Sequence, residues 1–89
     1  MYLHLGQTVM VREEEIVGVF DLDNTTSSKL TRAFLSRAEK DGRVKSIGAD
    51  IPKSFVVCAD GENTVYLTQM GTKTLKLRSE AGVFFEPEK

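Results

Sequence analysis

The sequence of 89 residues contains a single cysteine, two prolines and no tryptophan. One thiol, Cys58, excludes an internal disulfide bond and is consistent with a reducing compartment. No apolar run approaches the roughly 20 residues that a membrane-spanning helix requires. The N-terminus lacks the basic and long apolar regions of a secretory signal. We therefore expect a cytoplasmic protein, and the length allows one domain with one modest core.

The sequence also lacks an excess of charge of either sign. Its 12 lysines and arginines against 13 aspartates and glutamates give a formal net charge of -1 at pH 7. A strongly basic chain would indicate a nucleic-acid partner from composition alone, and this chain gives no such signal. Any surface that binds a polyanion must therefore arise from a local patch of cations, or from repetition of such a patch in an assembly.

What is present is a series of strand patterns. Short segments in which apolar and polar residues alternate, or in which β-branched residues follow one another, predict strands. In the first of them Leu3 and Leu5 share one face. The charged residues 12–15 are predicted to be a solvated connection, and the turn residues 60–63 join two strands into an antiparallel hairpin. The predicted strands are residues 2–5, 8–11, 16–20, 43–47, 54–59 and 64–68.

One amphipathic helix is predicted in the middle of the chain, ending before Gly42, which suits the left-handed position past a helix C-terminus. Leu30, Phe34 and Ala38 recur every four residues, so they form an apolar face that we expect to pack on the sheet. The candidates for the N-cap oxygen are Asn24, Thr25 and Thr26. The opposite face carries Lys29, Arg32, Ser36, Arg37 and Lys40.

These elements predict the α+β class: a small, mainly antiparallel β-sheet with one principal helix packed on it, in a single domain. Residues 72–78 alternate like a strand, but their lysines and leucines also suit a short helix, so both assignments stay open. The apolar tail residues 83–85 lie between Gly82 and Glu86-Pro87. We expect them either to fray or to dock on a neighbouring subunit or along a groove.

Residues 17–25 read VGVFDLDNT, and an apolar strand followed by Asp-x-Asp-x-Thr resembles the catalytic loop of the haloacid-dehalogenase-like phosphatases. In those enzymes the positions of Asp21 and Asp23 supply the nucleophile and the general acid/base, with Mg²⁺ between carboxylates and phosphate. Phosphoryl transfer needs further groups that hold the metal and neutralise charge. One principal helix cannot supply the successive crossovers of the parallel sheet that carries them. We therefore interpret the motif as a turn and helix cap, and expect neither enzymatic activity nor a cofactor.

Four segments, MYLHLGQTVMV, EEIVGVFDLDNTTSSKLTRAFLSRAEKDGRV, IPKSFVV and TVYLTQMGTKTLKLR, together resemble a known family. It is the family of small bacterial extracellular-matrix regulatory proteins, RemA and RemB, and the sequence resembles the RemB branch most. The resemblance covers residues 1–78, which we predict to be the regulatory domain, and leaves 79–89 as a C-terminal tail. Its most specific segments are FDLDNTT and IPKSFVV.

The resemblance implies a non-enzymatic transcriptional regulator of biofilm extracellular-matrix genes in Bacillus-like bacteria. The RemA branch is a DNA-binding regulator that assembles into rings, which implies a homo-oligomer here and double-stranded DNA as a partner. Repetition of a small cationic patch around a ring raises the affinity for a polyanion. The residues predicted to contact nucleic acid are Lys29, Arg32 and Lys53, with Arg43 and Lys45 as a possible extension.

Two positions depart from the DNA-binding branch. Glu15 stands where that branch has an Arg before the long strand, and Asp50-Ile51 stand where it has an arginine pair. Lys53 keeps a basic residue, and Arg32 matches a basic position in the helix. The alternative hypothesis is therefore an oligomeric protein-interaction module that acts through a DNA-binding partner, such as a related regulator subunit, and has no nucleic-acid affinity of its own.

Two further residues receive structural interpretations. His4 has no second His and no Cys nearby, so we expect it to contact solvent or a neighbouring strand and predict no metal site. Cys58 lies within the apolar run FVVCA. We predict that it is a small buried core residue and not a reactive thiol.

Overall fold

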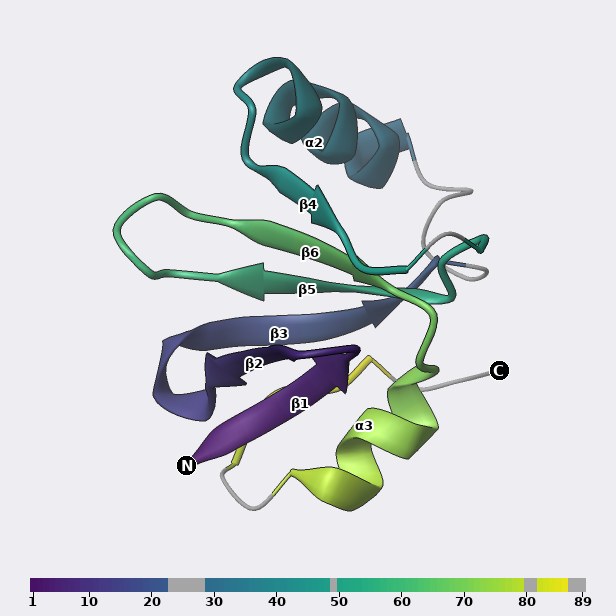
Figure 1. Cartoon of the computed structure of the whole chain (residues 1–89). Coiled ribbons are helices and arrows are strands. Elements are labelled where there is room, and N and C mark those ends of the chain that lie inside the picture. The colour runs from purple at the N-terminus through teal and green to yellow at the C-terminus, as the bar shows by residue number, and fades with distance from the viewer. Residues whose placement is uncertain (23–28, 49, 80–81, 87–89) are drawn as a thin grey trace.

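The computed structural model describes residues 1–22, 29–48, 50–79 and 82–86. Within these ranges the chain forms a two-stranded sheet, a four-stranded sheet and two α-helices, which confirms the α+β class (Figure 1). The strands are β1 (Tyr2–Gly6), β2 (Val9–Arg12), β3 (Ile16–Asp21), β4 (Val44–Ser46), β5 (Ser54–Cys58) and β6 (Val65–Thr68). The helices are α2 (Lys29–Lys40) and α3 (Thr72–Arg78), with a short 3-10 helix at Glu13–Glu15.

Strands β1 and β2 form an antiparallel hairpin. Leu3 pairs with Val11 across it, and Leu3 and Leu5 are buried on its inner face, which confirms the predicted alternation. The turn contains Gly6 and Gln7 with φ of 125° and 49°, backbone conformations that suit a tight reversal. The hairpin therefore presents one apolar face, and this face packs against the larger sheet.

The larger sheet has the strand order β3-β5-β6-β4. The β5–β6 hairpin is antiparallel as predicted, and the Asp60 carboxylate holds its turn by accepting the backbone N–H groups of Glu62 and Thr64, both at 3.2 Å. β4 lies at the edge of the sheet, as expected, and pairs parallel with β6. The sheet is therefore mainly antiparallel, with one parallel edge.

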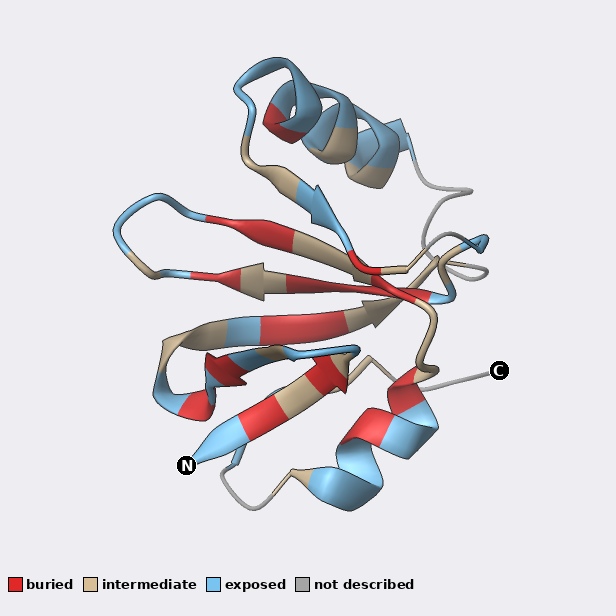
Figure 2. Ribbon diagram, in the orientation of Figure 1, coloured by how far each residue is buried: buried red, intermediate tan, exposed pale blue. Residues whose placement is uncertain are grey.

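Side chains alternate between the two faces of this sheet along β5. Val56 and Cys58 face the β1–β2 hairpin and α3, whereas Phe55 and Val57 face α2. The chain thus forms three layers, with the sheet in the middle (Figures 1 and 2). The larger buried cluster contains Leu3, Leu5, Val11, Val19, Ile47, Val56, Cys58 and Leu75. The smaller buried cluster contains Ala38, Phe55 and Val65.

Helix α2 packs on the sheet through its C-terminal half only. Ala38 is fully buried, but Leu30 is 84% exposed and Phe34 is 37% exposed, so the prediction of a continuous buried face is wrong at its N-terminal end (Figure 2). Gly42 has φ of 71° and its N–H donates to the Glu39 carbonyl at 3.0 Å, which confirms the left-handed termination. The predicted N-cap residues 24–26 lie outside the described residues.

Residues 72–78 form helix α3, which decides between the two open assignments. Thr72 and Leu75 lie three residues apart on one face of the helix and are both buried. Leu75 belongs to the larger cluster, beneath the β1–β2 hairpin. A strand would have placed Leu75 and Leu77 on the same face, whereas the helix buries the first and leaves the second 81% exposed.

The connection at residues 12–15 is less solvated than predicted. Glu13 is only 3% exposed, and its carboxylate accepts a hydrogen bond from the Ser79 hydroxyl. A buried carboxylate requires such a partner, since an unpaired one is costly. The expectation of a fully solvated connection was wrong because sequence reasoning did not anticipate that the chain returns over Glu13 after α3.

The tail residues 83–86 do not fray, and they dock along β3 of the same chain. The Val19 N–H donates to the Phe84 carbonyl, and the Glu86 N–H donates to the Val19 carbonyl, both at 2.9 Å. The Phe84 ring lies 5.8 Å from the ring of Phe20. A side chain on Gly18 would come within 3.2 Å of Phe84, so glycine leaves room for this contact. The tail therefore extends the edge of the sheet.

Candidate nucleic-acid interface

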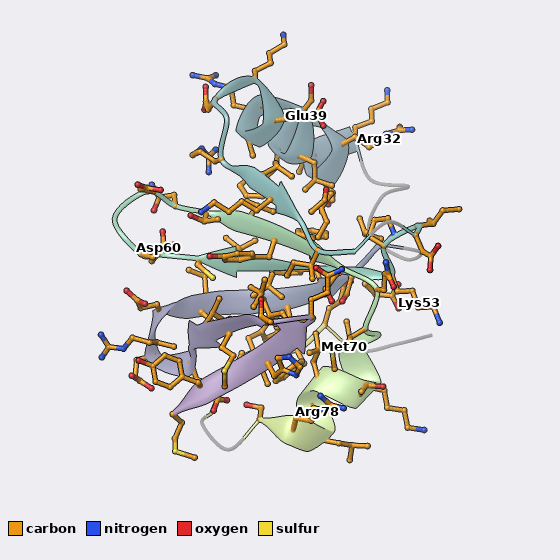
Figure 3. The ribbon with its side chains drawn as sticks, in the orientation of Figure 1. Arg32, Glu39, Lys53, Asp60, Met70 and Arg78 are labelled. Atoms are coloured by element: carbon orange, nitrogen blue, oxygen red, sulfur yellow. The ribbon has the colours of Figure 1, made fainter. Side chains whose placement is uncertain are left out.

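Two of the predicted cations, Lys29 and Arg32, lie on the first turn of α2 and are exposed. They are three residues apart, which puts them on the same side of the helix. Figure 3 shows the Arg32 side chain directed away from the sheet. At the other end of the helix, Arg37 forms an ion pair with Asp41, just past the helix, at 3.5 Å. The structure therefore places Lys29 and Arg32 together in solvent.

The third predicted cation, Lys53, is exposed on the loop that precedes β5. Its backbone is fixed on both sides, because its N–H donates to the Thr68 carbonyl at 2.8 Å and its carbonyl accepts the Leu22 N–H at 3.0 Å. Leu22 directly follows β3 on the path toward α2. Lys53 therefore has a rigid base between the end of β6 and the segment that leads to Lys29 and Arg32.

The two cations named as a possible extension differ from one another. The Arg43 guanidinium donates to the Asn63 carbonyl at 2.8 Å and lies 3.5 Å from the Asp41 carboxylate, so it ties α2 to the β5–β6 turn. Lys45 is exposed on the edge strand β4. Arg43 thus has a structural role at the far end of the sheet, away from Lys53.

The acidic residue Glu15 lies at an acidic end of the molecule. The Glu15 carbonyl accepts the Ala59 N–H at 2.7 Å, which brings the 3-10 helix beside the β5–β6 turn. Burial, together with the nearby charges of Asp60 and Glu15, raises the pKa of the Cys58 thiol to about 11. Burial, together with the nearby charges of Asp60, Glu62 and Glu15, also raises the pKa of Tyr66. We call Glu14, Glu15, Asp60 and Glu62 the acidic end.

The acidic end and Lys53 lie at opposite ends of β5. Lys53 directly precedes this strand, and Asp60 follows it after one intervening residue; Figure 3 shows the two on opposite sides of the molecule. Five extended residues span roughly 17 Å. Asp50 lies on the same loop as Lys53 and lines a cavity of about 290 Å³ with Gln69 and Gly48. Glu15, at the acidic end, is thus remote from Lys53, whereas Asp50 lies on the same loop as Lys53.

Sequence reasoning missed an apolar groove between α2 and β3. Its volume is about 340 Å³. Exposed Leu30 and Val17 stand on its opposite walls, and β5 forms its floor. The signal was present in the apolar stripe of α2, which we had assigned to the core. The lining residues are Val17, Phe20, Leu30, Thr31, Phe34, Phe55, Val57 and Glu86.

Of the Asp and Thr positions in the phosphatase-like motif, only Asp21 lies in the described part of the chain. The backbone N–H of Asp21 donates to the Glu86 carboxylate at 3.0 Å, so the end of β3 is covered by the tail. Asp23, Asn24 and Thr25 lie outside the described residues. In the residues that the structure describes, no group of three or more His, Cys, Asp and Glu side chains is arranged to hold a metal ion.

Two smaller predictions concern His4 and Cys58. The His4 Nε2 lies 2.6 Å from the Gln7 carbonyl, so the imidazole interacts within its own hairpin. Cys58 is 2% exposed within the larger cluster, which confirms its assignment to the core. Of the helices in the described ranges, none has the length and apolar character needed to span a membrane.

Comparison with known proteins gives a family assignment. No family model matches the sequence. Extracellular matrix regulatory protein B of Bacillus subtilis (strain 168) is 34% identical to this chain over 80 residues. The match covers 90% of this chain and 91% of that protein, so it extends over nearly the whole of both.

Proposed function

Because this chain belongs to the family of extracellular matrix regulatory protein B, we propose that it is a non-enzymatic, cytoplasmic regulator of biofilm extracellular-matrix genes. In this proposal it binds double-stranded DNA as a homo-oligomer. The proposed contacts are to phosphates, from Lys29, Arg32 and Lys53. No base-reading residue is assigned.

The observation that carries this proposal is the separation of charge across the molecule. Arg32 and Lys53 extend into solvent from separate elements, and Asp60 of the acidic end lies on the opposite side (Figure 3). When a polyanion approaches Lys53, the length of β5 therefore separates its phosphates from Asp60. This separation supports attraction of DNA to one side of a chain whose net charge is -1.

Oligomerisation supplies the affinity that one subunit lacks. Three exposed cations give a weak contact, since each phosphate that is neutralised releases about one counterion. When subunits are joined, the later contacts become intramolecular, and the overall affinity rises without any new contact within a subunit. The proposal therefore requires both DNA binding and self-association.

The test of DNA binding is fluorescence anisotropy of a labelled A·T-rich duplex, titrated with the protein across a salt series. We expect the affinity to fall as salt rises, and Lys29→Ala with Arg32→Ala to reduce the log–log slope by about 2 for each subunit that contacts the duplex. Arg37→Ala is the matched control on the same helix, because Arg37 is paired with Asp41. Absence of binding at about 10 µM protein in low salt would contradict the proposal, since even non-specific binding reaches this range.

The apolar groove favours a second candidate function, the protein-interaction module. Leu30, Val17 and Phe84 are 84%, 58% and 54% exposed around one side of the sheet, and such a patch is costly to leave in water. In this alternative the groove joins copies of the chain, and a partner protein contacts DNA. Sedimentation of the wild type and of Leu30→Glu separates the cases: a smaller particle for the variant supports association through the groove, and identical particles contradict it.

A further inference from the structure

The two edges of the larger sheet differ in how they are protected from pairing with another chain. An edge strand presents unpaired N–H and C=O groups, to which a strand of another molecule can add. At one edge, β4 has only three residues and includes the exposed Lys45, and both features disfavour such addition (Figure 1). At the other edge, β3 has six residues, IVGVFD, of which the first five are uncharged. A strand of this composition pairs readily with copies of itself, so its edge needs protection.

The first part of β3 is protected by a β-bulge. The pairing of β3 with β5 shifts its register between Ile16 and Gly18, which makes Val17 the extra residue. A bulge bends and twists an edge, and this disfavours the addition of a regular strand. From Gly18 to Asp21 the pairing with β5 is regular, residue by residue. The second part of β3 therefore has the geometry that an added strand requires.

The tail residues 83–86 cover this second part of β3. Val19 directs both of its backbone groups at the tail, since its N–H donates to the Phe84 carbonyl and its carbonyl accepts the Glu86 N–H, both at 2.9 Å. Two residues further along, the Asp21 N–H donates to the Glu86 carboxylate at 3.0 Å. The tail thus occupies the backbone groups that a strand added at this edge would use.

Side chains hold the tail on both faces of the sheet. Val83 and Phe85 pack against the larger cluster. The Phe84 ring lies 5.8 Å from the ring of Phe20, which faces α2. The backbone pairing is short in comparison, an isolated parallel bridge between Phe85 and Val19. Because so few backbone hydrogen bonds form this pairing, we expect that removal of one loosens the tail from the edge.

We propose that the tail is an autoinhibitory strand, whose residues 83–86 keep the edge of β3 closed to the β3 strand of a second copy. The partner is a second copy because every copy carries the same uncharged segment of β3. When the tail is released, two such edges can pair antiparallel about a two-fold axis, since each presents the same groups to the other. This goes beyond the proposed function, in which the edge of β3 has no role. The proposed homo-oligomer then forms through another surface.

The test compares two variants of the full chain at Glu86. Glu86→Pro removes both the N–H that donates to Val19 and the carboxylate that accepts the Asp21 N–H. Glu86→Gln is the matched control, because it keeps the backbone N–H and a side-chain oxygen that can accept. In sedimentation velocity at rising protein concentration, Glu86→Pro should form particles of about twice the wild-type mass or more. Glu86→Gln should sediment as the wild type does, and identical behaviour of the two variants would overturn the proposal.

A second substitution assigns the added association to the edge of β3. Glu86 and Leu30 both line the apolar groove, so association through the groove must be separated from pairing at the edge. Glu86→Pro should still form the larger particles when Leu30→Glu is added, since Leu30 lies on α2. Loss of the larger particles in this double variant would assign them to the groove and overturn the proposal.

Circular dichroism checks that each variant keeps the helix and strand content of the wild type. A Glu86→Pro variant that unfolds is replaced by Phe84→Ala, which removes the ring contact with Phe20 but no backbone group. Wild-type sedimentation of Phe84→Ala would also overturn the proposal. None of these measurements depends on DNA, so a failure of the proposed function is distinguishable from a failure of this inference.

Discussion

The two helices carry similar charge but are attached to the protein in different ways. Of the 12 residues of α2, Ala38 alone is buried, and Leu30 near its start is 84% exposed. Of the seven residues of α3, both Thr72 and Leu75 are buried, and Leu75 is 0% exposed. Figure 2 shows this contrast as a mostly exposed α2 and a striped α3. The shorter helix is thus the better anchored one.

This contrast shows that the backbones of the two helices are fixed to different extents. The backbone of α3 rests on the main core through Leu75. Lys29 and Arg32 rest on the end of α2 that stands over an unfilled apolar groove. A contact that fills this groove would also fix those cations. Self-association through the groove and DNA binding through α2 are therefore expected to favour one another.

The largest expected effect comes from making the same substitution, leucine to alanine, in each of the two helices. Leu75→Ala removes a fully buried side chain from the larger cluster and should lower the free energy of unfolding by about 2–5 kcal/mol. Leu30→Ala removes an exposed side chain and should change it by less than about 0.5 kcal/mol in the monomer. Urea denaturation at low protein concentration measures both. Equal losses would show that α2 is anchored as firmly as α3.

A smaller effect depends on pH and reports on the core beneath α3. Burial and the carboxylates of Asp60 and Glu15 raise the pKa of Cys58 to about 11, from the ordinary value of 9.0. Between these values the unfolded thiol ionises while the folded one stays protonated, so the free energy of unfolding should fall as pH rises from about 9 to 11.

Cys58→Ala provides the control for this pH effect, because it removes the ionising group. The difference in stability between the wild type and the variant should shrink over the same pH range. Iodoacetamide should also modify the wild-type thiol only as fast as the protein unfolds. Rapid modification of the folded protein at pH 7 would contradict the buried position of Cys58.

The smallest of these effects concerns the end of α2. Gly42 has φ of 71°, and a Cβ there would meet no atom within 4 Å, so Gly42→Ala introduces backbone strain without a clash. We expect a loss of about 1 kcal/mol in the free energy of unfolding. Gly82→Ala is the matched control, since Gly82 has no positive φ and the same open surroundings. A loss at Gly82 equal to that at Gly42 would remove the explanation by strain.

The sequence was sufficient for the local elements of the fold. Alternation placed Leu3 and Leu5 on one face of β1, and the apolar run at residues 54–59 predicted β5. Gly42 was recognised as the end of a helix because glycine readily adopts the left-handed conformation that follows a helix C-terminus. Each of these predictions depends on neighbours in sequence, whose geometry the chain itself constrains.

Features that depend on distant residues were not predictable in the same way. Periodicity showed which face of α2 is apolar, but not that the sheet covers only its C-terminal half. The pairing of Phe85 with Val19 joins residues far apart in sequence through two backbone hydrogen bonds, so no local pattern indicates it. Lys29, Arg32 and Lys53 are exposed, as expected for charged side chains. Their contact with DNA stays a prediction.

The most direct test of the account is a map of the surface that contacts DNA. Backbone amide shifts of the ¹⁵N-labelled full chain would be followed by NMR during titration with a short duplex. The account predicts changes at Lys29, Arg32 and Lys53, with none at the acidic end. Changes confined to the acidic end or the apolar groove, or none at all, would contradict it.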